Sequence, residues 1–490
     1  MTVVVSLVTR HCKPAFMPLA LLCLKASLVE RGGLPADGVR IFEFSPGDSA
    51  DAIAEQILAG DPDVIGLSCY VWNIGALMEA ARRIKEQRPD VRIVLGGPEV
   101  GPLAARTLER HPAVDAVVKS EGEIPLCEIV TAWSRQAGLD DVKGICFRRG
   151  GMVVDTGEAA LVKDLDSYPS PHLAKYGDYT GRIICVETQR GCVFRCSFCF
   201  YNKDYSLRNR RFDLDRVKED VAFWLQQDIK ELYLMDPVFN LNAERAREIC
   251  RFIAEHNTRH IPIHAEIWAE FVDDDMARLM KAADFGYLEV GLQTTDTTAL
   301  ATVERRLKLQ KFIEGIACLR RHNLVFELQL IFGLPGETRT SFRSSLNFAM
   351  SLDPTELSVF TLMVLPGTEL WKSAETLRLD FEPAPPYRAL SHMTMDAEDF
   401  EYGQRLADAA HTLAPWRAAR LLARERGLSF ADLAEKWVEW DHSDDAVTDR
   451  DRVEHFVTRV CDEAEIPPDF YRHVIRLAAD PPPAPRPPLP

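Results

Sequence analysis

The chain has 490 residues, of which 47% are hydrophobic and 27% charged, and its formal net charge is −16. This length allows two or three domains with separate cores, and the composition is typical of a soluble globular protein. The acidic balance argues against a nucleic-acid partner, which normally requires a basic surface. No segment has the long apolar run that a membrane span needs.

The N-terminal stretch "MTVVVSLVTRHCKPAF" has no basic region before its apolar run and does not resemble a signal peptide. Twelve cysteines in a chain of this length fall short of the density of a disulfide framework. We therefore expect a protein of the reducing cytoplasm.

The first part of the chain alternates apolar strands with helical patterns, which predicts a doubly wound, Rossmann-like parallel sheet in a domain spanning residues 1–138. The predicted strands lie near residues 2–10, 39–44, 63–72, 91–97 and 113–123, and helices near 17–32, 51–60 and 76–89.

Turn residues follow three of these strands, where a parallel sheet binds its ligands. Glycines there let the backbone approach a ligand closely, and three such loops at one edge favour a large flat ligand over ordinary turns. The candidate residues are Ser68, Cys69, Tyr70, Gly96, Gly97, Glu99, Glu121, Gly122 and Glu123.

Residues 139–180 predict a connector that includes a small hairpin near 145–158, and a second strand–helix series follows. Six strands with intervening helices predict a partial (β/α)6 barrel over residues 181–380, with its chemistry at the strands' carboxyl ends. The predicted strands lie near residues 181–191, 229–240, 261–270, 287–295, 325–337 and 356–370, with a helix at 213–227.

From residue 381 the alternation stops, and residues 381–480 predict a helical C-terminal domain with helices near 401–427 and 450–466. We expect this domain to cap the barrel mouth. The proline-rich residues 481–490 lack the backbone donors for helix or sheet and should be disordered.

The stretch "QRGCVFRCSFCFYN" places Cys192, Cys196 and Cys199 within eight residues, without a fourth cysteine nearby. A zinc site would need a fourth ligand, and a redox Cys-x-x-Cys would leave Cys192 unexplained. Cys185 lies in the preceding apolar strand, where a buried packing thiol is the plain interpretation. Thiolates at this density suit an iron–sulfur cluster with one iron open to another molecule.

Cys-x3-Cys-x2-Cys after the first barrel strand, with Phe198 before its last cysteine, resembles the signature of the radical S-adenosylmethionine (SAM) superfamily. The resemblance implies that the three cysteines bind a [4Fe-4S] cluster whose fourth iron is chelated by SAM. It also implies an electron donor such as flavodoxin or ferredoxin.

Later segments match other superfamily motifs less closely. "LYLMDPVFN", "EVGLQTT" and "LIFGLPGET" stand where the superfamily contacts SAM, although the first departs from the usual Gly-Gly-Glu. Arg305 or Arg306 could bind the SAM carboxylate, and one face of the third barrel strand should line the barrel. The SAM-binding candidates are Phe198, Asp236, Glu266, Glu289, Gln293, Arg306, Gly333 and Pro335.

The N-terminal domain resembles the cobalamin-binding domain that precedes many radical SAM enzymes, on the segments "DVIGLSCYVWNIGAL", "IVLGGPEVG" and "AVVKSEGE". The Asp-x-His-x-x-Gly motif that supplies a cobalt ligand is absent, and His11 lacks that spacing. Cobalamin would then bind without a histidine ligand, with Cys69 or Tyr70 near cobalt. A flavin or dinucleotide is disfavoured because no Gly-x-Gly-x-x-Gly follows the first strand.

The two resemblances together imply a cobalamin-dependent radical SAM C-methyltransferase of natural-product, amino-acid or peptide precursors. Methyl would pass from SAM through methylcobalamin to a substrate carbon, either by a 5′-deoxyadenosyl radical route or by polar transfer. The alternatives are a non-methylating enzyme that catalyses cyclisation, ring contraction or oxidation, and a non-catalytic cobalamin- or cluster-binding protein.

Overall fold

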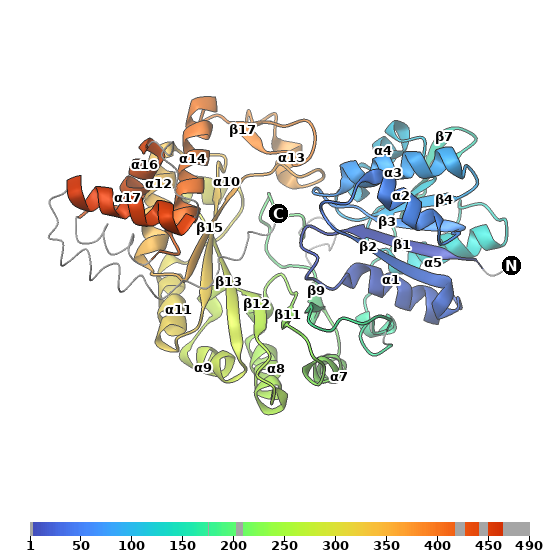
Figure 1. The fold of residues 1–490 in the computed structure, drawn as a ribbon, viewed down its shortest axis with the longest axis horizontal. Coiled ribbons are helices and arrows are strands. Elements are labelled where there is room, and N and C mark those ends of the chain that lie inside the picture. Colours follow the sequence, from blue (N-terminus) through green and yellow to red (C-terminus); the bar gives the residue numbers. More distant parts are fainter. Residues whose placement is uncertain (1–2, 175, 202–208, 417–426, 441–448, 464–490) are drawn as a thin grey trace.

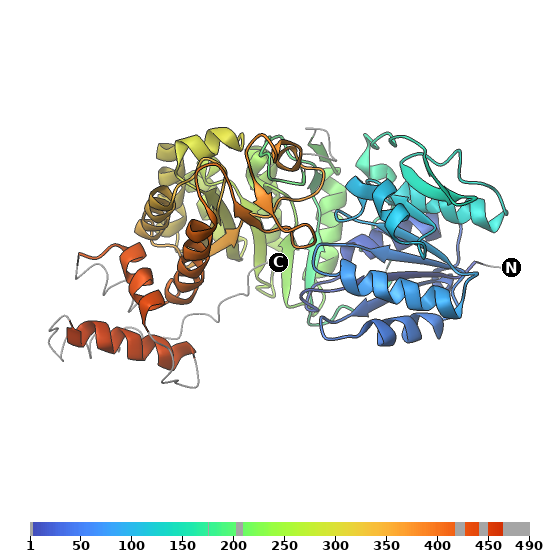
Figure 2. The same cartoon turned by 90° about the horizontal axis from the view of Figure 1, so that it is seen from above.

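The computed structural model describes residues 3–174, 176–201, 209–416, 427–440 and 449–463. Two α/β units lie side by side, with helices α16 (Phe430–Glu439) and α17 (Asp449–Glu463) on the side of the second unit away from the first (Figures 1 and 2). Across these described ranges no helix is both long and apolar enough to cross a membrane.

The first sheet has seven strands in the order β2–β1–β3–β4–β5–β6–β7. The strands are β1 (Val5–Arg10), β2 (Val39–Phe44), β3 (Val64–Ser68), β4 (Arg92–Gly96), β5 (Ala116–Val118), β6 (Ile145–Arg149) and β7 (Met152–Asp155). The first five run parallel, which confirms the predicted doubly wound sheet. The predicted hairpin also forms, but it pairs antiparallel with β5 and so extends this sheet beyond residue 138.

Helices cover both faces of this sheet, as long apolar strands require. The helices are α1 (Leu19–Glu30) and α5 (Glu123–Ser134) on one face, and α2 (Ala50–Leu58), α3 (Ile74–Gln87) and α4 (Ala104–Arg110) on the other. The strand order reverses direction between β1 and β3, the point at which such sheets bind ligands.

The second sheet is the predicted partial barrel, with six parallel strands in the order β15–β14–β13–β12–β11–β8. The strands are β8 (Ile183–Val186), β11 (Glu231–Leu234), β12 (Ile263–Ile267), β13 (Phe285–Gln293), β14 (Phe326–Phe332) and β15 (Glu356–Thr361). The helices are α7 (Leu214–Leu225), α8 (Ala243–His256), α9 (Asp274–Ala282), α10 (Thr297–Thr302), α11 (Leu309–Arg321) and α12 (Arg339–Ser351).

The chain between β1 and α1 joins the two sheets at the free edge of β8. Phe16 bridges Ile183 in parallel, the Met17 N–H donates to the Ile183 carbonyl at 2.9 Å, and Ile183 N–H donates to Ala15 at 2.8 Å. The carboxyl edge of the first sheet is therefore attached directly to the first barrel strand.

The C-terminal region continues through α13 (Glu369–Ser373), β16 (Asp380–Phe381), β17 (Ala389–Ser391) and α14 (Ala397–Leu413). Phe400 of α14 packs on Phe332 at the end of β14, with ring centroids 5.2 Å apart. Trp437, Trp440 and Phe456 pack against one another, so these tryptophans belong to the core of the helical region. The predicted tail at 481–490 and part of the helix predicted at 401–427 lie outside the described residues.

Candidate functional site

The cysteine loop is carried by a short antiparallel stem that follows β8. The stem consists of β9 (Gln189–Arg190) and β10 (Arg210–Arg211), with Arg190 opposite Arg210. Gly191 turns the chain out of β9 with φ of +88°, a conformation that favours glycine, and Cys192 follows directly. The loop thus leaves the barrel at the carboxyl end of its first strand, as predicted.

Asp236, predicted to contact SAM, holds the base of this stem. Its buried carboxylate accepts hydrogen bonds from Thr188 N–H at 2.8 Å, Thr188 Oγ1 at 2.6 Å and Gln189 N–H at 3.1 Å. Burial raises the pKa of Asp236 to about 7, although these hydrogen bonds oppose the shift. These three hydrogen bonds hold the base of the stem, and the contact between Asp236 and SAM stays a prediction.

Backbone contacts fix the turn that carries the second and third cysteines. Cys199 N–H donates to the Cys196 carbonyl at 3.0 Å, and Ser197 N–H donates to the Val303 carbonyl at 2.9 Å. Phe194 stacks on Trp268 at the end of β12, with ring centroids 3.9 Å apart. The loop is therefore held to the barrel mouth on both sides of Cys196.

The three thiols influence one another electrostatically. Burial and then Cys196 raise the pKa of Cys199, to about 12, and Cys192 contributes further. The pKa of Cys192 is also raised, by burial and by Cys196, with the nearby guanidinium of Arg305 opposing the shift. Such thiols stay protonated until a metal displaces the proton.

In the described part of the chain no three His, Cys, Asp or Glu side chains meet closely enough to hold a single metal ion. A four-iron cluster is wider than one ion, so its cysteine ligands stand further apart. Three mutually coupled thiols on one anchored loop, beside a cation, fit such a cluster.

Arg305, and not Arg306, is the arginine that faces the cysteines. Arg305 is buried, donates from Nη1 to Cys196 Sγ at 3.7 Å and lies over the Trp268 ring at 4.5 Å. Its Nη2 also donates to the Gly291 carbonyl. Arg306 is exposed, and SAM binding by either of these two arginines stays a prediction.

Gln293 lies beside this arginine. A Cβ added to Gly291 would come within 2.5 Å of Gln293 Nε2 and 3.3 Å of Arg305 Nη2, so Gln293 folds back over Gly291. Gln293 itself has a positive φ of 69° at the end of β13, a conformation uncommon for a residue with a side chain. The contact between Gln293 and SAM stays a prediction.

Polar side chains from neighbouring strands line the inside of the barrel. His264 of β12 lies between Glu231 of β11, at 3.1 Å from Nδ1, and Glu289 of β13, at 2.9 Å from Nε2. Gln329 of β14 donates to Glu289 at 3.0 Å. Burial alone would lower the pKa of His264, but the hydrogen bonds to Glu231 and Glu289 raise it.

Glu266 is two residues from His264 on β12, so both side chains face the lumen. Glu266 accepts from Tyr233 Oη at 2.9 Å. Burial, together with the charge of Glu289, raises the pKa of Glu266 to about 8. Its charge also reaches Cys199, which puts Glu266 near the mouth of the barrel.

The other SAM candidates are packed against protein. Phe198 is partly buried against the barrel core, and Pro335 is buried. Gly333 has φ of +84°, and a Cβ there would lie 2.7 Å from the ring of Phe400 on α14. This glycine is therefore required by the contact with α14, and any cofactor contact falls to the backbone around it.

At the facing edge of the first sheet, buried Asn73 organises the loop after β3. Its Oδ1 accepts from Tyr70 N–H at 2.8 Å, and its Nδ2 donates to the carbonyls of Ser68 at 3.0 Å and Arg10 at 3.2 Å. Cys69 is fully buried and its thiol points to the Leu67 carbonyl, which removes it from the surface that a ligand would meet.

Tyr70 and Trp72 form a flat stack on the same loop, with centroids 4.4 Å apart and planes at 9°. Burial raises the pKa of Tyr70, and Glu187, which follows β8, adds to the shift. The loop after β3 therefore lies near the first barrel strand. Between the two candidates for the residue near cobalt, Tyr70 is the accessible one.

The two glycines after β4 have different roles. Gly97 has φ of +110°, and a Cβ there would lie 2.4 Å from the Cys69 carbonyl oxygen, so Gly97 lets the loops after β3 and β4 touch. A Cβ on Gly96 would meet nothing nearer than 3.9 Å. The open backbone at Gly96 and the flat aromatic pair fit a flat ligand such as a corrin.

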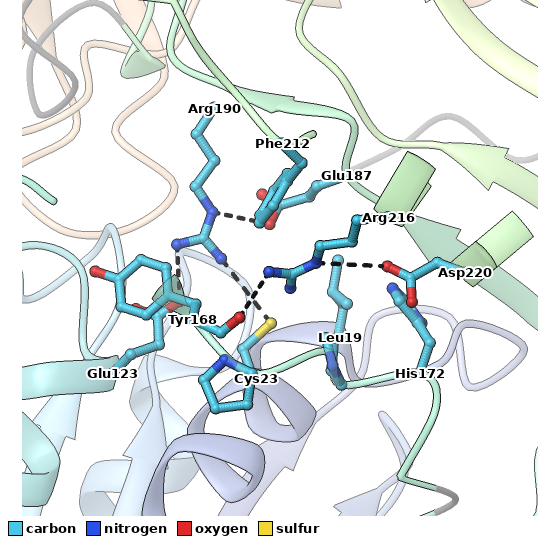
Figure 3. A pocket seen from close by; sticks show the side chains of 12 residues that line it. Leu19, Cys23, Glu123, Tyr168, His172, Glu187, Arg190, Phe212, Arg216 and Asp220 are labelled. Carbon is cyan, nitrogen blue, oxygen red and sulfur yellow. Dashed lines mark hydrogen bonds and ion pairs between the residues drawn. The ribbon is translucent and has the colours of Figure 1, made fainter. Parts of the chain in front are cut away.

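The three predicted carboxylates bind barrel-side residues instead of facing open space. Glu99 accepts from Tyr387 Oη at 2.5 Å. Glu123 binds Arg190 at 2.7 Å (Figure 3). Glu121 binds Arg210 at 2.5 and 3.1 Å. We therefore retain their loops, including Gly122, as predicted cobalamin contacts but not these carboxylate groups.

The roles of Arg190, Arg210, His264 and Trp268 could not be predicted from the sequence. Each occupies an ordinary strand or strand-end position, and their partners lie far away along the chain. The available signal was the direct succession Arg190–Gly191–Cys192, which places a cation next to the cysteine loop.

Comparison with known proteins agrees with this arrangement. The model of the B12 binding domain matches residues 5–130, and the model of the Radical SAM superfamily matches residues 186–349. Together the two models cover more than half of the chain. The radical SAM domain implies a [4Fe-4S] cluster and SAM, and the B12 domain implies cobalamin.

TokK, a cobalamin-dependent radical SAM methyltransferase of Streptomyces tokunonensis, is 29% identical over 346 residues, which is 66% of this chain and 49% of TokK. The chain thus spans about half the length of this relative. An anaerobic magnesium-protoporphyrin IX monomethyl ester cyclase of Rubrivivax gelatinosus is 24% identical over 69% of this chain and 62% of its own length.

Among solved structures, the radical SAM methyltransferase TsrM from Kitasatospora setae, with cobalamin and a [4Fe-4S] cluster bound, matches with a TM-score of 0.65 and 20% identity. The match covers 82% of this chain and 81% of TsrM, and at this identity it concerns the fold. The chain belongs to the radical SAM superfamily, among the members that carry an N-terminal B12-binding domain.

Proposed function

We propose that this protein is a cobalamin-dependent radical SAM C-methyltransferase. The observation that carries the proposal is the contact between the carboxyl edge of the first sheet and the cysteine loop, made by Arg190 with Glu123 at 2.7 Å. Two cofactor sites joined in this way suit a reaction in which a group held at one site reaches a substrate activated at the other.

When bound, the cluster and SAM would supply a substrate radical or an activated methyl group, and cobalamin would carry the methyl group. The three cysteines would hold the cluster, with Arg305 and Trp268 beside it. Glu266, Glu289 and Gln293 would line the SAM side of the lumen. The loops around Tyr70 and Gly96 would face the corrin, and the closed interface would exclude water.

The proposed substrate is a natural-product intermediate or an amino-acid or peptide precursor. TokK supports this assignment through its methyltransferase activity, and TsrM has been solved with tryptophan substrate and a SAM analogue. Reduction of the cluster would require an electron donor such as flavodoxin or ferredoxin, and we propose that the reaction takes place in the cytoplasm.

The first test is anaerobic reconstitution with iron, sulfide and cobalamin, followed by reduction with SAM that carries a labelled methyl group. We expect label to be recovered on cobalamin from the native chain, accompanied by 5′-deoxyadenosine if the radical route operates. Cys196→Ala should lose site-bound iron and both products while it retains cobalamin. Full iron content and unchanged turnover in this variant would overturn the proposal.

Cys250→Ala is the matched control, because Cys250 is a buried thiol of α8 outside the cysteine loop. It should keep the iron content, the cobalamin and the SAM products of the native chain. Loss of iron from both variants would mean that the assay reports general damage to the fold.

The second candidate is a non-methylating enzyme, favoured by the similarity to the cyclase of Rubrivivax gelatinosus. In that case the native chain would form 5′-deoxyadenosine, and no label would reach cobalamin or any product. A chain that binds both cofactors but cleaves no SAM would instead be a binding protein. The single labelling experiment separates all three outcomes.

A further inference from the structure

Both strands of the stem that carries the cysteine loop contact the same segment of the first domain. Arg190 of β9 binds Glu123 at 2.7 Å and Glu121 at 3.5 Å. Arg210 lies opposite Arg190 on β10 and donates to the Glu121 carboxylate from both Nη atoms, at 2.5 and 3.1 Å. The loop with the three cysteines is thus joined at both ends to residues that follow β5.

This cluster is closed to solvent. The side chains of Arg190, Arg210, Glu121 and Glu123 are between 7% and 10% exposed. Figure 3 shows Arg190 directed between Glu187 and Glu123, with the ring of Tyr168 beside it; the guanidinium carbon lies 5.3 Å from that ring. Arg190 Nε also donates to Glu187 at 2.9 Å, so this single side chain connects β8, β9 and the first domain.

The arginines face protein and not a ligand site. The cavity beside Arg190, lined also by Cys23 and Arg216, has a volume of about 20 Å³, enough for about one water molecule. A guanidinium that serves a substrate would need an opening. Here the two guanidiniums are bound by protein groups. Glu121 and Glu123 of the first domain bind them together with Glu187, which follows β8, and the Val162 carbonyl.

Such a cluster fixes the relative orientation of the two domains more than it strengthens their binding. Buried ion pairs return little net stability, because desolvation offsets their attraction, but the planar guanidinium binds a carboxylate in a fixed orientation. Arg190 is two residues before Cys192, and Glu123 begins α5 at the sheet edge that faces the barrel. Only Arg190, Gly191 and the contact with Glu123 therefore separate Cys192 from the cobalamin-binding edge.

Other contacts between the domains do not have this connection. Arg182 binds Glu43 at 2.9 and 2.5 Å, but it lies just before β8 and away from the cysteine loop. Tyr387 binds Glu99 from the C-terminal hairpin region. These contacts join the two units, whereas the arginine stem joins the loop itself.

We propose that Arg190 and Arg210, through Glu121 and Glu123, are positioning residues that hold the cysteine loop at a fixed distance and orientation from the cobalamin edge. The inference rests on the proposed function only in that both cofactors take part in one reaction. The stem then sets the separation between the cluster and cobalt. Weakening its contacts with the first domain should change this separation while both cofactors stay bound.

The test compares Arg190→Gln and Glu123→Gln with Glu43→Gln, which weakens the interdomain pair that does not touch the loop. Each holoprotein is first assayed for iron and cobalamin content. Electron paramagnetic resonance then measures the magnetic coupling between the reduced cluster and cob(II)alamin, which reports their separation. Label recovered on cobalamin per 5′-deoxyadenosine gives the chemical coupling.

We expect Arg190→Gln and Glu123→Gln to keep both cofactors, to change or broaden the magnetic coupling, and to lower the labelling ratio by about 10- to 100-fold, the cost of a misplacement near 1 Å. Glu43→Gln should leave both measurements as in the native chain. If Arg190→Gln fails to load its cofactors, Arg190→Lys takes its place. Lysine keeps the positive charge but cannot bind a carboxylate with two N–H groups, so this variant should show the same change in magnetic coupling and labelling ratio.

Magnetic coupling unchanged in fully loaded Arg190 and Glu123 variants would overturn the positioning role. The same shift in Glu43→Gln would also overturn it, because any interdomain contact would then suffice. If the native chain never labels cobalamin and the magnetic coupling still changes as expected, the methyl-transfer proposal fails and the positioning role stands.

Discussion

The two parallel sheets of this protein use their strands in different ways. In the first sheet the buried positions of β3 and β4 are apolar, and β1 adds only the buried hydroxyls of Ser6 and Thr9. The polar residues of interest begin where these strands end. In the second sheet the strands themselves carry the polar groups. Glu231, His264, Glu289, Glu327 and Glu356 come from five successive strands and are all buried.

The difference follows from what covers each sheet. Helices pack on both faces of the first sheet, so a polar side chain within a strand would be buried without a partner. A barrel has an inner face, where side chains of adjacent strands meet one another. There Tyr287 donates to Glu356 at 2.8 Å and Gln329 to Glu289 at 3.0 Å, so the polar lining satisfies itself.

The largest expected effect comes from removing the imidazole from the barrel lining. His264→Leu leaves Glu231 and Glu289 buried without the imidazole between them, and we expect a loss of about 3–5 kcal/mol in the free energy of unfolding. His264→Gln, which can still bond one carboxylate, should lose less. Chemical denaturation followed by circular dichroism measures both.

His260→Asn is the control, since the His260 side chain is 80% exposed just before the same strand and Asn tolerates the φ of +53° found there. Its stability should stay within about 0.5 kcal/mol of the native chain. A similarly small effect for His264→Leu would show that the polar lining adds nothing to the barrel, and the contrast between the sheets would be one of composition only.

In the first sheet the sensitive positions should be at the strand ends, and the paired glycines after β4 test this. Gly97→Ala forces a side chain into φ of +110° and brings its Cβ within 2.4 Å of the Cys69 carbonyl oxygen. The backbone strain alone costs roughly 1–3 kcal/mol, and the contact adds to it. We expect lower stability and loss of bound cobalamin, with the iron content unchanged.

Gly96→Ala provides the comparison one residue earlier, where the added Cβ has 3.9 Å of clearance. It should keep native stability and weaken cobalamin binding alone, if the corrin lies over Gly96 as proposed. Absorbance of retained cobalamin and thermal unfolding separate the two effects. Equal behaviour of both variants would contradict the different roles of the two glycines.

The same contrast explains what could be predicted from the sequence. Strands, helices and the cysteine loop depend on local periodicity and spacing. The parallel strands of both sheets, and the order of the two domains along the chain, could therefore be predicted. The predicted hairpin forms as well, but its attachment to β5 depends on a free sheet edge that local sequence does not reveal. The turn glycines likewise indicated which edge of the first sheet should bind a ligand. They did not indicate which of the glycines is needed for close contact between loops.

Side-chain roles were predicted less well, because they depend on partners distant in the chain. Glu121 and Glu123 were expected to face a ligand, and the structure gives them Arg210 and Arg190 as partners. Arg305 and Arg306 are adjacent, and only the path of the chain after α10 decides which one is buried. Asp236 has a ligand-like position in the sequence but binds the backbone of Thr188 and Gln189.

A buried carboxyl group at a strand end of the barrel gives an effect that depends on pH. Glu337 is fully buried below the turn after β14, where it accepts from Thr294 Oγ1 at 2.8 Å and from Gly333 N–H at 3.1 Å. Burial raises its pKa to about 8 from an ordinary value near 4.5. The native protein therefore keeps a proton that the unfolded chain releases between these values.

Because the native state binds the extra proton, this group stabilises the fold fully below its unfolded pKa and loses that contribution as pH rises toward about 8. Glu337→Gln removes the proton exchange, so native stability relative to the variant should fall by up to about 1.4 kcal/mol per pH unit across this window. Denaturation at several pH values measures the slope.

Glu401→Gln, on the exposed surface of α14, should leave this pH dependence unchanged. A native chain whose stability relative to Glu337→Gln is flat between pH 5 and 8 would mean that this carboxyl is ionised in the folded barrel, with a polar environment there that its hydrogen bonds alone do not provide.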